Sequence, residues 1–304
     1  MISLANTAQS ASSGLSFRPF AWDEALELRA DHTGARAICG GTDLMVEINF
    51  DRTRPIGLLD LSGVPELKSW ERIEDGNTIR LGAGVSYSRI IAELATECPG
   101  LAIAARTVGS PQIRNRGTVG GNLATASPAG DSHPPLLACR ARVEVASIRG
   151  SRLIDIDDFF VGPKQSALKP DELIRAVLVP VARGPQQFAK IGPRNAMVIA
   201  TASFAVSLDP VSGRVGTGIG SAGPTPLRAP QAEQFLEDAL SSRWSSPGPP
   251  DREVLDRFGE LVAAAASPID DVRGTADYRR HGLAVLARRC GGWTWADLAG
   301  RTQS

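Results

Sequence analysis

Two short glycine pairs are the residues of this sequence best suited to bind a ligand. One lies in CGGTD at residues 39–43, and the other lies in TVGGN at residues 118–122. A glycine pair lets backbone N–H groups approach a ligand because no Cβ is in the way, and an array of such groups binds phosphate oxygens. Each pair alone is more typical of a tight turn. Two pairs, without a Walker lysine, predict a diphosphate held between two loops.

A third glycine motif, GIGSAG at residues 218–223, satisfies the pattern G-x-G-x-x-G. That pattern binds a dinucleotide only where its last glycine opens a helix whose N-terminus faces the pyrophosphate. The next residues here are PTPLRAP, and the preceding segment looks like the second strand of a hairpin. We therefore predict a strand end followed by a proline-rich turn, and no Rossmann site.

Residues 109–131, GSPQIRNRGTVGGNLATASPAGD, contain little bulky side chain. Their composition predicts neither a good helix nor an ordinary strand. We interpret the stretch as a backbone surface that a ligand can approach closely. Asp131 closes it, and a carboxylate there could accept hydrogen bonds from a ribose or an adenine. A turn residue or a helix N-cap is the simpler interpretation of Asp131.

Composition excludes several classes of function. The 33 basic and 33 acidic residues of this 304-residue chain balance, which offers no support for a nucleic-acid partner. No stretch approaches about 18 uninterrupted apolar residues, so no membrane span is expected. The four cysteines and three histidines are widely spaced, which predicts no metal or iron–sulfur site within the chain. Reduced thiols and the absence of a signal-peptide pattern at the N-terminus favour the cytoplasm.

The pattern of apolar residues predicts short strands interspersed with a few helices, and not strict strand–helix alternation. We expect helices at 22–30, 89–98 (ended by Pro99-Gly100), 231–240, 252–266 and 275–290, and strands at 35–39, 57–62, 78–85, 139–147, 171–180, 197–209 and 213–220. A short linker is predicted at 182–187. The resulting division is a disordered leader at 1–15, a larger domain at 16–185 and a smaller α+β domain at 186–304.

The order of the motifs resembles the FAD-binding subunit of the molybdenum hydroxylases, the family of xanthine dehydrogenase and carbon monoxide dehydrogenase. The matching segments include AICGGTDLMVEIN, TVGGNLATASPAGD and GTADYRRHGLAVLARR, and the resemblance extends over residues 16–292. It implies an α+β fold: a two-subdomain FAD-binding domain of the vanillyl-alcohol-oxidase (PCMH) type, followed by a small C-terminal α+β domain with a three-stranded sheet and a layer of helices.

The resemblance also implies FAD as the cofactor and supplies the residues that would contact it. They are Ala37, Ile38, Cys39, Gly40, Gly41, Thr42, Asp43 and Leu44 around the pyrophosphate, Thr118, Val119, Gly120, Gly121 and Asn122 as a second wall, and Asp131, Val108, Ile174 and Lys190. A lysine near the flavin would stabilise the negative charge of its reduced form. Cys39 replaces a smaller residue of the family, and Val108 is aliphatic where some relatives have an aromatic, which leaves the electron acceptor open.

The function implied by the resemblance is electron transfer. In the family, a molybdopterin-containing large subunit hydroxylates the substrate, two 2Fe-2S clusters on a small iron–sulfur subunit pass electrons to FAD, and FAD passes them to NAD+, O2 or another acceptor. This chain would be one subunit of a heterotrimer, with no catalytic acid or base of its own. The alternatives are a stand-alone FAD-dependent oxidase or reductase, and a module that no longer binds FAD. Arg114, Asn115 and Arg116 could face the flavin, the iron–sulfur partner or only the local fold.

Overall fold

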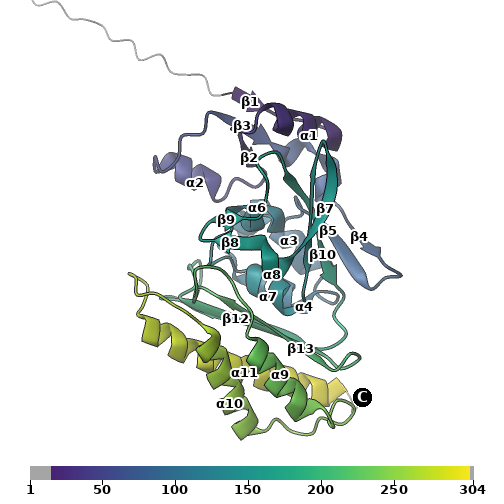
Figure 1. The fold of residues 1–304 in the computed structure, drawn as a ribbon, viewed down its shortest axis with the longest axis vertical. Coiled ribbons are helices and arrows are strands. Elements are labelled where there is room, and N and C mark those ends of the chain that lie inside the picture. Colours follow the sequence, from purple (N-terminus) through teal and green to yellow (C-terminus); the bar gives the residue numbers. More distant parts are fainter. Residues whose placement is uncertain (1–14, 302–304) are drawn as a thin grey trace, which may run out of the picture.

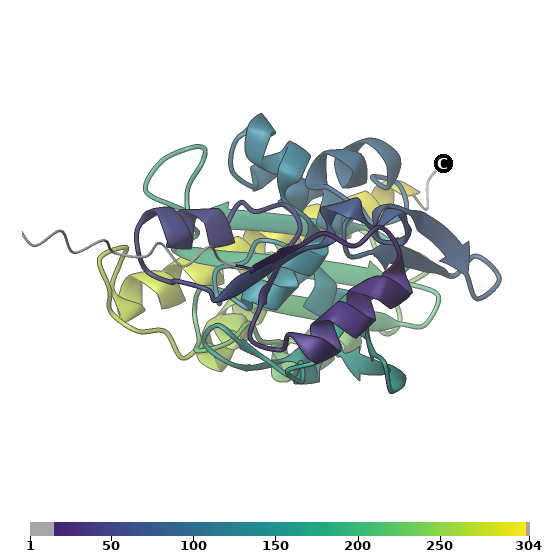
Figure 2. The same ribbon diagram turned by 90° about the horizontal axis from the view of Figure 1, so that it is seen from above.

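The computed structural model describes residues 15–301, so residues 1–14 of the predicted leader lie outside the described part. Three sheets follow one another from top to bottom in Figure 1. The first is a parallel sheet in the spatial order β1 (Leu15–Phe17), β3 (Gly57–Asp60), β2 (Arg36–Ile38). Parallel strands need a crossover connection, and the helices α1 (Trp22–Asp31) and α2 (Leu44–Asn49) lie in these connections. Figure 2 shows the small sheet and α1 from above.

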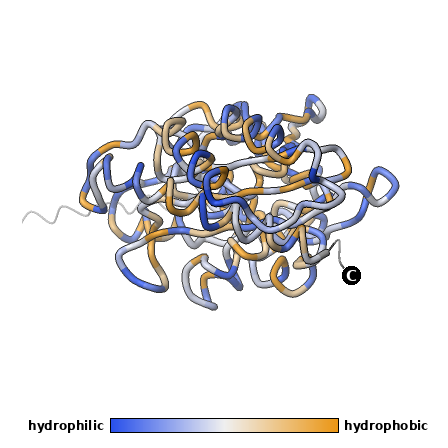
Figure 3. Tube along the Cα trace, turned by 90° about the horizontal axis from the view of Figure 1, so that it is seen from below, coloured by the Kyte–Doolittle hydropathy of each residue, from blue (hydrophilic) through white to orange (hydrophobic). Residues whose placement is uncertain are grey.

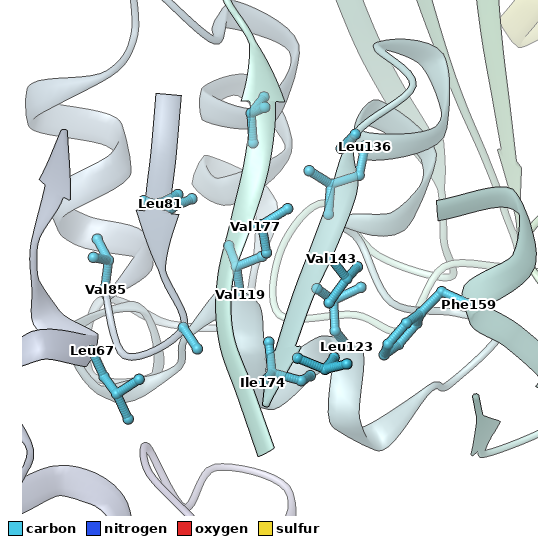
Figure 4. Packing of buried hydrophobic residues seen from close by; sticks show 14 of the residues in the cluster. Leu67, Leu81, Val85, Val119, Leu123, Leu136, Val143, Phe159, Ile174 and Val177 are labelled. Carbon is cyan, nitrogen blue, oxygen red and sulfur yellow. The ribbon is translucent and has the colours of Figure 1, made fainter. Parts of the chain in front are cut away.

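The second sheet is antiparallel, with β10 in its centre, and its order is β4 (Trp70–Ile73), β5 (Thr78–Gly82), β10 (Leu173–Pro180), β6 (Arg142–Ser147), β7 (Gly150–Asp155). In β10, Val177 lies opposite Leu81 on one side and Val143 on the other. All three side chains are buried. Figure 4 shows how they pack with Val119 and Leu123 of a neighbouring helix in one apolar cluster. This cluster is the core beneath the first two sheets.

Short elements surround the second sheet. They are the 3-10 turns η1 (Leu61–Gly63) and η2 (Pro65–Lys68), the helices α3 (Tyr87–Glu93), α4 (Pro99–Thr107), α5 (Pro111–Arg116), α6 (Val119–Thr125), α7 (His133–Ala138) and α8 (Ile156–Phe159), and the two-stranded pair β8 (Phe160–Gly162) and β9 (Gln165–Ser166). They connect β5 to β6, β7 to β10 and β3 to β4.

Two predictions for this region are wrong. The helix expected at 89–98 ends at Glu93, and Pro99 begins the next helix instead of ending the first. Proline suits the first helical position because its missing N–H would have no partner there. Residues 109–131 also contain two helices, α5 and α6, each capped by the hydroxyl of the preceding residue, Ser110 or Thr118. Caps and tertiary packing stabilise these short helices where intrinsic propensity does not.

The third sheet has the antiparallel order β11 (Gln186–Ile191), β12 (Ala202–Asp209), β13 (Arg214–Gly220), and it carries a second apolar core. The helices α9 (Pro230–Leu240), α10 (Arg252–Ala265) and α11 (Ala276–Arg301) cover one face (Figure 1). Figure 3, which views the molecule from below, shows apolar and polar stretches alternating along the chain. The sequence missed β11, which overlaps the expected linker, and the strand expected from 197 begins only at Ala202.

The other face of the third sheet packs directly against α7. A Cβ on Gly216 would lie 1.9 Å from the carbonyl oxygen of Ala138, and one on Gly218 would lie 2.0 Å from that of Pro134. These glycines in GIGSAG therefore allow close packing. No helix follows them until α9, and β13 is antiparallel to β12, so the prediction that the motif is not a Rossmann site is confirmed. The boundary expected between residues 185 and 186 remains a prediction.

Candidate functional site

Both glycine pairs line one cavity, of about 520 Å³, between the small parallel sheet and the second sheet. The structure brings most of the predicted FAD contacts to this cavity. Val119, Asp131 and Lys190 are the predicted residues that do not line it. Val119 is fully buried in the apolar core beside β10. The apolar side chains of Val108 and Ile174 line the cavity together with the polar glycine segments.

The first glycine turn, at residues 40–43, requires glycine at both positions of its pair. Gly41 has a φ of +75°, which residues with a Cβ rarely adopt. Gly40 lies so close to α5 that a Cβ there would be 2.1 Å from the carbonyl oxygen of Arg116. The backbone N–H groups of residues 40–43 donate no hydrogen bond to any described residue. Free N–H groups beside a cavity are suited to bind an anionic group, so this turn fits the diphosphate of a cofactor.

The second glycine pair differs from the loop that the sequence predicts, because it forms the first turn of α6. The N–H of Gly120 donates to the carbonyl oxygen of Ala83, and the N–H of Gly121 donates to the hydroxyl of Thr118. These groups are therefore occupied. A Cβ on Gly120 would lie 2.6 Å from the Ala83 oxygen, whereas Gly121 faces open space except for the Thr118 hydroxyl at 3.1 Å. The first turn thus supplies donors, and Gly121 supplies room.

Buried hydroxyls orient Asn122, which lines the cavity. The hydroxyl of Ser132 donates to the side-chain oxygen of Asn122 at 2.7 Å, and the hydroxyl of Tyr87 donates to Ser132 at 3.4 Å. Burial raises the pKa of Tyr87, so its phenol stays protonated. Because the oxygen of the Asn122 amide is already an acceptor, its NH2 group remains as a donor.

His133 follows this group and is fully buried. Its Nε2 lies 3.3 Å from the backbone oxygen of Asn122, its Nδ1 has no partner among the described residues, and its ring lies 4.6 Å from that of Phe160. Burial lowers the pKa of His133 from 6.5 to about 4. The imidazole is therefore neutral in the folded protein at neutral pH.

We expect acid to destabilise the protein through His133. Because the folded-state pKa is lowered, the unfolded chain takes up a proton at a higher pH than the folded one. The free energy of unfolding should therefore fall as the pH drops from 6.5 to about 4, by about 3 kcal/mol in total. Denaturant unfolding at several pH values measures this slope. His133→Leu should flatten it, while the same change at the exposed His281 should not.

Asp131 and Lys190 bind each other instead of lining the cavity. Lys190 Nζ lies 2.6 Å from Asp131 Oδ2 and also donates to the carbonyl oxygens of Thr107 and Val198. The side chain of Asp131 is 11% exposed and that of Lys190 is 9% exposed. Burial raises the pKa of Asp131 to about 6, although Lys190 opposes the shift. Asp131 is not a helix N-cap, since Ser132 occupies that position before α7. The pair lies beside the Val108 end of the cavity, because Thr107 adjoins Val108.

Residues 114–116 serve different purposes. Arg114 donates to the carbonyl oxygens of Val108 and Gly109 at 3.1 and 3.0 Å, and Asn115 accepts from the hydroxyl of Ser88. Arg114 and Asn115 therefore hold the local fold. Arg116 lines a second, smaller cavity of about 250 Å³, which shares the first glycine turn with the larger one.

Sequence reasoning missed several charged residues of the large cavity: Arg29, Arg36, Glu47, Lys164 and Glu172. Glu47 and Lys164 form an ion pair, and Glu172 is paired with Arg152. No ion pair of Arg29 or Arg36 is found within residues 15–301. These side chains come from separate elements, so no local spacing could have indicated them. Within the same residues, no group of histidine, cysteine and acidic side chains could hold a metal ion, and no helix is long and apolar enough to cross a membrane.

Free N–H groups and glycine turns beside one cavity, on an α+β fold, define a protein that binds a phosphate-containing cofactor. Comparison with known families specifies which one. Residues 10–182 match the FAD binding domain in molybdopterin dehydrogenase, and residues 187–294 match the CO dehydrogenase flavoprotein C-terminal domain.

Individual relatives agree with these matches. The chain is 33% identical to the nicotine 6-hydroxylase medium subunit of Paenarthrobacter nicotinovorans (87% of this chain, 91% of the relative), and 29% identical to the xanthine dehydrogenase FAD-binding subunit of Escherichia coli O157:H7 (88% and 90%). Its structure is similar to a chain of carbon monoxide dehydrogenase from Hydrogenophaga pseudoflava, with a TM-score of 0.84 and 27% identity over 93% of this chain and 97% of that one.

The chain belongs to the family of FAD-binding subunits of the molybdenum hydroxylases. It is an oxidoreductase subunit whose cofactor is FAD, and the fold class implied by the sequence resemblance is confirmed.

Proposed function

We propose that FAD bound to this chain takes electrons from 2Fe-2S clusters on an iron–sulfur subunit and passes them to NAD+, O2 or another acceptor. The molybdopterin-containing large subunit of the same complex would oxidise the substrate. NAD+ and O2 are the acceptors to be tested. The proposed location of the complex is the cytoplasm.

One observation carries the proposal for the site: residues 40–43, whose N–H groups have no partner among the described residues, line the same cavity as Gly121, which has open space at its Cβ position. The first turn would hold the pyrophosphate, and the NH2 group of Asn122 would donate to the cofactor. Val108 and Ile174 offer apolar surface of the kind that an aromatic ring system covers. The FAD contacts assigned to Val119, Asp131 and Lys190 are the least supported, since none of them lines the cavity.

When bound, FAD supplies the redox chemistry, and the chain holds it and shapes its surroundings. The roles of the residues here are to bind, to orient and to exclude water. The buried Tyr87–Ser132–Asn122 chain fixes one donor. The Asp131–Lys190 pair places a cation and an anion next to the Val108 end, where they contribute a fixed local field. No catalytic acid or base is assigned to the chain.

The test uses the native complex. A tagged copy of the chain is purified gently from its own organism, and the complex is examined by optical and electron paramagnetic resonance spectroscopy for flavin and 2Fe-2S clusters. Its clusters are then reduced without oxygen and mixed rapidly with NAD+ or O2, with FAD present, with FAD removed, and with FAD restored. We expect fast reoxidation of the clusters only when FAD is present.

Equal reoxidation rates with and without FAD would contradict the proposed electron route. If the native chain instead runs alone, yellow, and turns over a small substrate without partners, it is a stand-alone oxidase or reductase. The flavin absorbance of the preparation tests FAD binding, and the rate of cluster reoxidation tests electron transfer. The two claims are therefore judged separately.

A further inference from the structure

An ion pair joins two distant parts of the chain at the cavity. Lys164 Nζ lies 2.7 Å from Glu47 Oε1, and 117 positions separate the two residues. Glu47 is on α2, and Lys164 is in the turn between β8 and β9. Both line the large cavity. Figure 1 shows α2 and the β8–β9 pair on the same side of the molecule.

The α2 segment has little else to hold it. None of its residues is buried, and Met45, Val46 and the adjoining Phe50 are 40%, 45% and 70% exposed. Residues with positive φ flank the segment: Gly41 before it and Asp51 after it. A helix without buried apolar side chains has no core contacts to fix its position. Its side-chain hydrogen bonds to the rest of the cavity therefore matter more than such bonds usually do.

The backbone of Lys164, in contrast, is bound to a buried part of the protein. Its backbone N–H donates to the carbonyl oxygen of Ala126 at 3.1 Å, and Ala126 is buried at the C-terminal end of α6. A second link runs parallel to the ion pair, since the hydroxyl of Thr125 on α6 lies 3.3 Å from Asp43 Oδ2. Both links tie the exposed segment to the helix that forms the opposite wall of the cavity.

We propose that the Glu47–Lys164 pair is a strap that holds α2 beside α6 and slows the release of FAD. The inference rests on the proposal that FAD occupies this cavity. Residues 40–43 lead directly into α2, so a displacement of α2 shifts the N–H groups that would hold the pyrophosphate. Breaking the strap therefore loosens the phosphate site without touching the core.

An exposed ion pair contributes little to global stability. Lys164 is 62% exposed, so the strap should act on a local opening and not on unfolding of the whole protein. A contact that only stabilised the fold would instead change the free energy of unfolding of the whole protein. Variants should change the rate of FAD dissociation and leave the melting temperature of the FAD-free protein nearly unchanged.

The experiment measures FAD release from the holoprotein as the rise in flavin fluorescence after dilution. Glu47→Gln and Lys164→Met should each raise the dissociation rate about three- to fivefold, as expected for the loss of one exposed pair. The double variant should exceed the faster single variant only slightly, because both changes remove the same interaction. The charge swap, Glu47→Lys with Lys164→Glu, should restore a slow rate. Salt at about 1 M, where the Debye length is about 3 Å, should bring the unchanged protein towards the variants.

Arg257→Gln is the matched control, because Arg257 pairs with Glu260 on the exposed surface of α10. It removes one exposed ion pair and should not change FAD release. Dissociation rates that stay unchanged in all strap variants, or single effects that simply add, would overturn the strap while the FAD site stands. An unchanged chain that binds no FAD would refute the site itself, and the strap with it.

Discussion

Gly121→Val is expected to give a folded protein that no longer retains FAD. The new side chain would enter the open space of the cavity, where the one described side-chain atom within 4 Å of the Cβ position is the Thr118 hydroxyl, at 3.1 Å. The backbone of α6 tolerates the change, since valine is a better helix former than glycine. Filling the space that the pyrophosphate needs should weaken FAD binding by at least about 100-fold, or roughly 3 kcal/mol. Flavin absorbance per chain and a fluorescence titration of the apoprotein measure the effect.

Two other glycines make the test specific. Gly300→Val is the matched control, because Gly300 also lies in a helix and, among residues 15–301, no atom outside the backbone of its own helix lies within 4 Å of its Cβ position. It should leave FAD binding unchanged. Gly40→Ala should instead damage the fold, since its Cβ would overlap the Arg116 carbonyl oxygen. Stoichiometric FAD in Gly121→Val would mean that the pyrophosphate does not lie against α6.

Lys190→Met should destabilise the protein more than any surface change. It leaves Asp131 buried without its counter-charge, and breaking such a pair costs about 3–5 kcal/mol. Burial already raises the pKa of Asp131 to about 6 against the opposing effect of Lys190. Without the lysine this pKa rises further, so the carboxyl becomes neutral more readily. The loss of stability should therefore be largest above pH 7 and shrink as the pH falls below 6.

Denaturant unfolding of the FAD-free and FAD-bound protein at pH 7.5 and 5.5 measures this loss. Lys190→Met combined with Asp131→Asn should recover most of the stability at pH 7.5, because no buried charge is left unpaired. A double variant as unstable as the single one would show that the lysine acts through its bonds to Thr107 and Val198, and not through Asp131.

Much of the architecture could be predicted. The hairpin around residues 209–214, the helices of the C-terminal layer and three strands of the second sheet, β5, β6 and β10, follow from turn residues and apolar periodicity. The errors concern short helices and some strands, since β4 and β11 were not predicted and β12 begins later than expected. Pro99 begins a helix, although it was expected to end the preceding one. The helix α6 forms in spite of two glycines because Thr118 caps it and Val119 and Leu123 are buried. Local propensity is a weak guide where caps and tertiary contacts supply most of the stability.

The sequence by itself determined the family and predicted which segments would hold the cofactor. Glycine pairs and their flanking residues are local patterns, and a backbone turn such as that at Gly41 depends on few neighbours. Only the tertiary structure decided what each residue of these segments does. It shows that the N–H groups of residues 40–43 are free while those of Gly120 and Gly121 are occupied.

The long-range pairs also belong to the tertiary structure. Asp131 meets Lys190 across 59 positions, and Glu47 meets Lys164 across 117. Such pairs depend on how two sheets and their helices pack against each other, which no spacing along the chain records. The packing therefore decides which charged side chains meet. The effects predicted here for Lys190→Met on stability and for the Glu47–Lys164 pair on FAD release both depend on it.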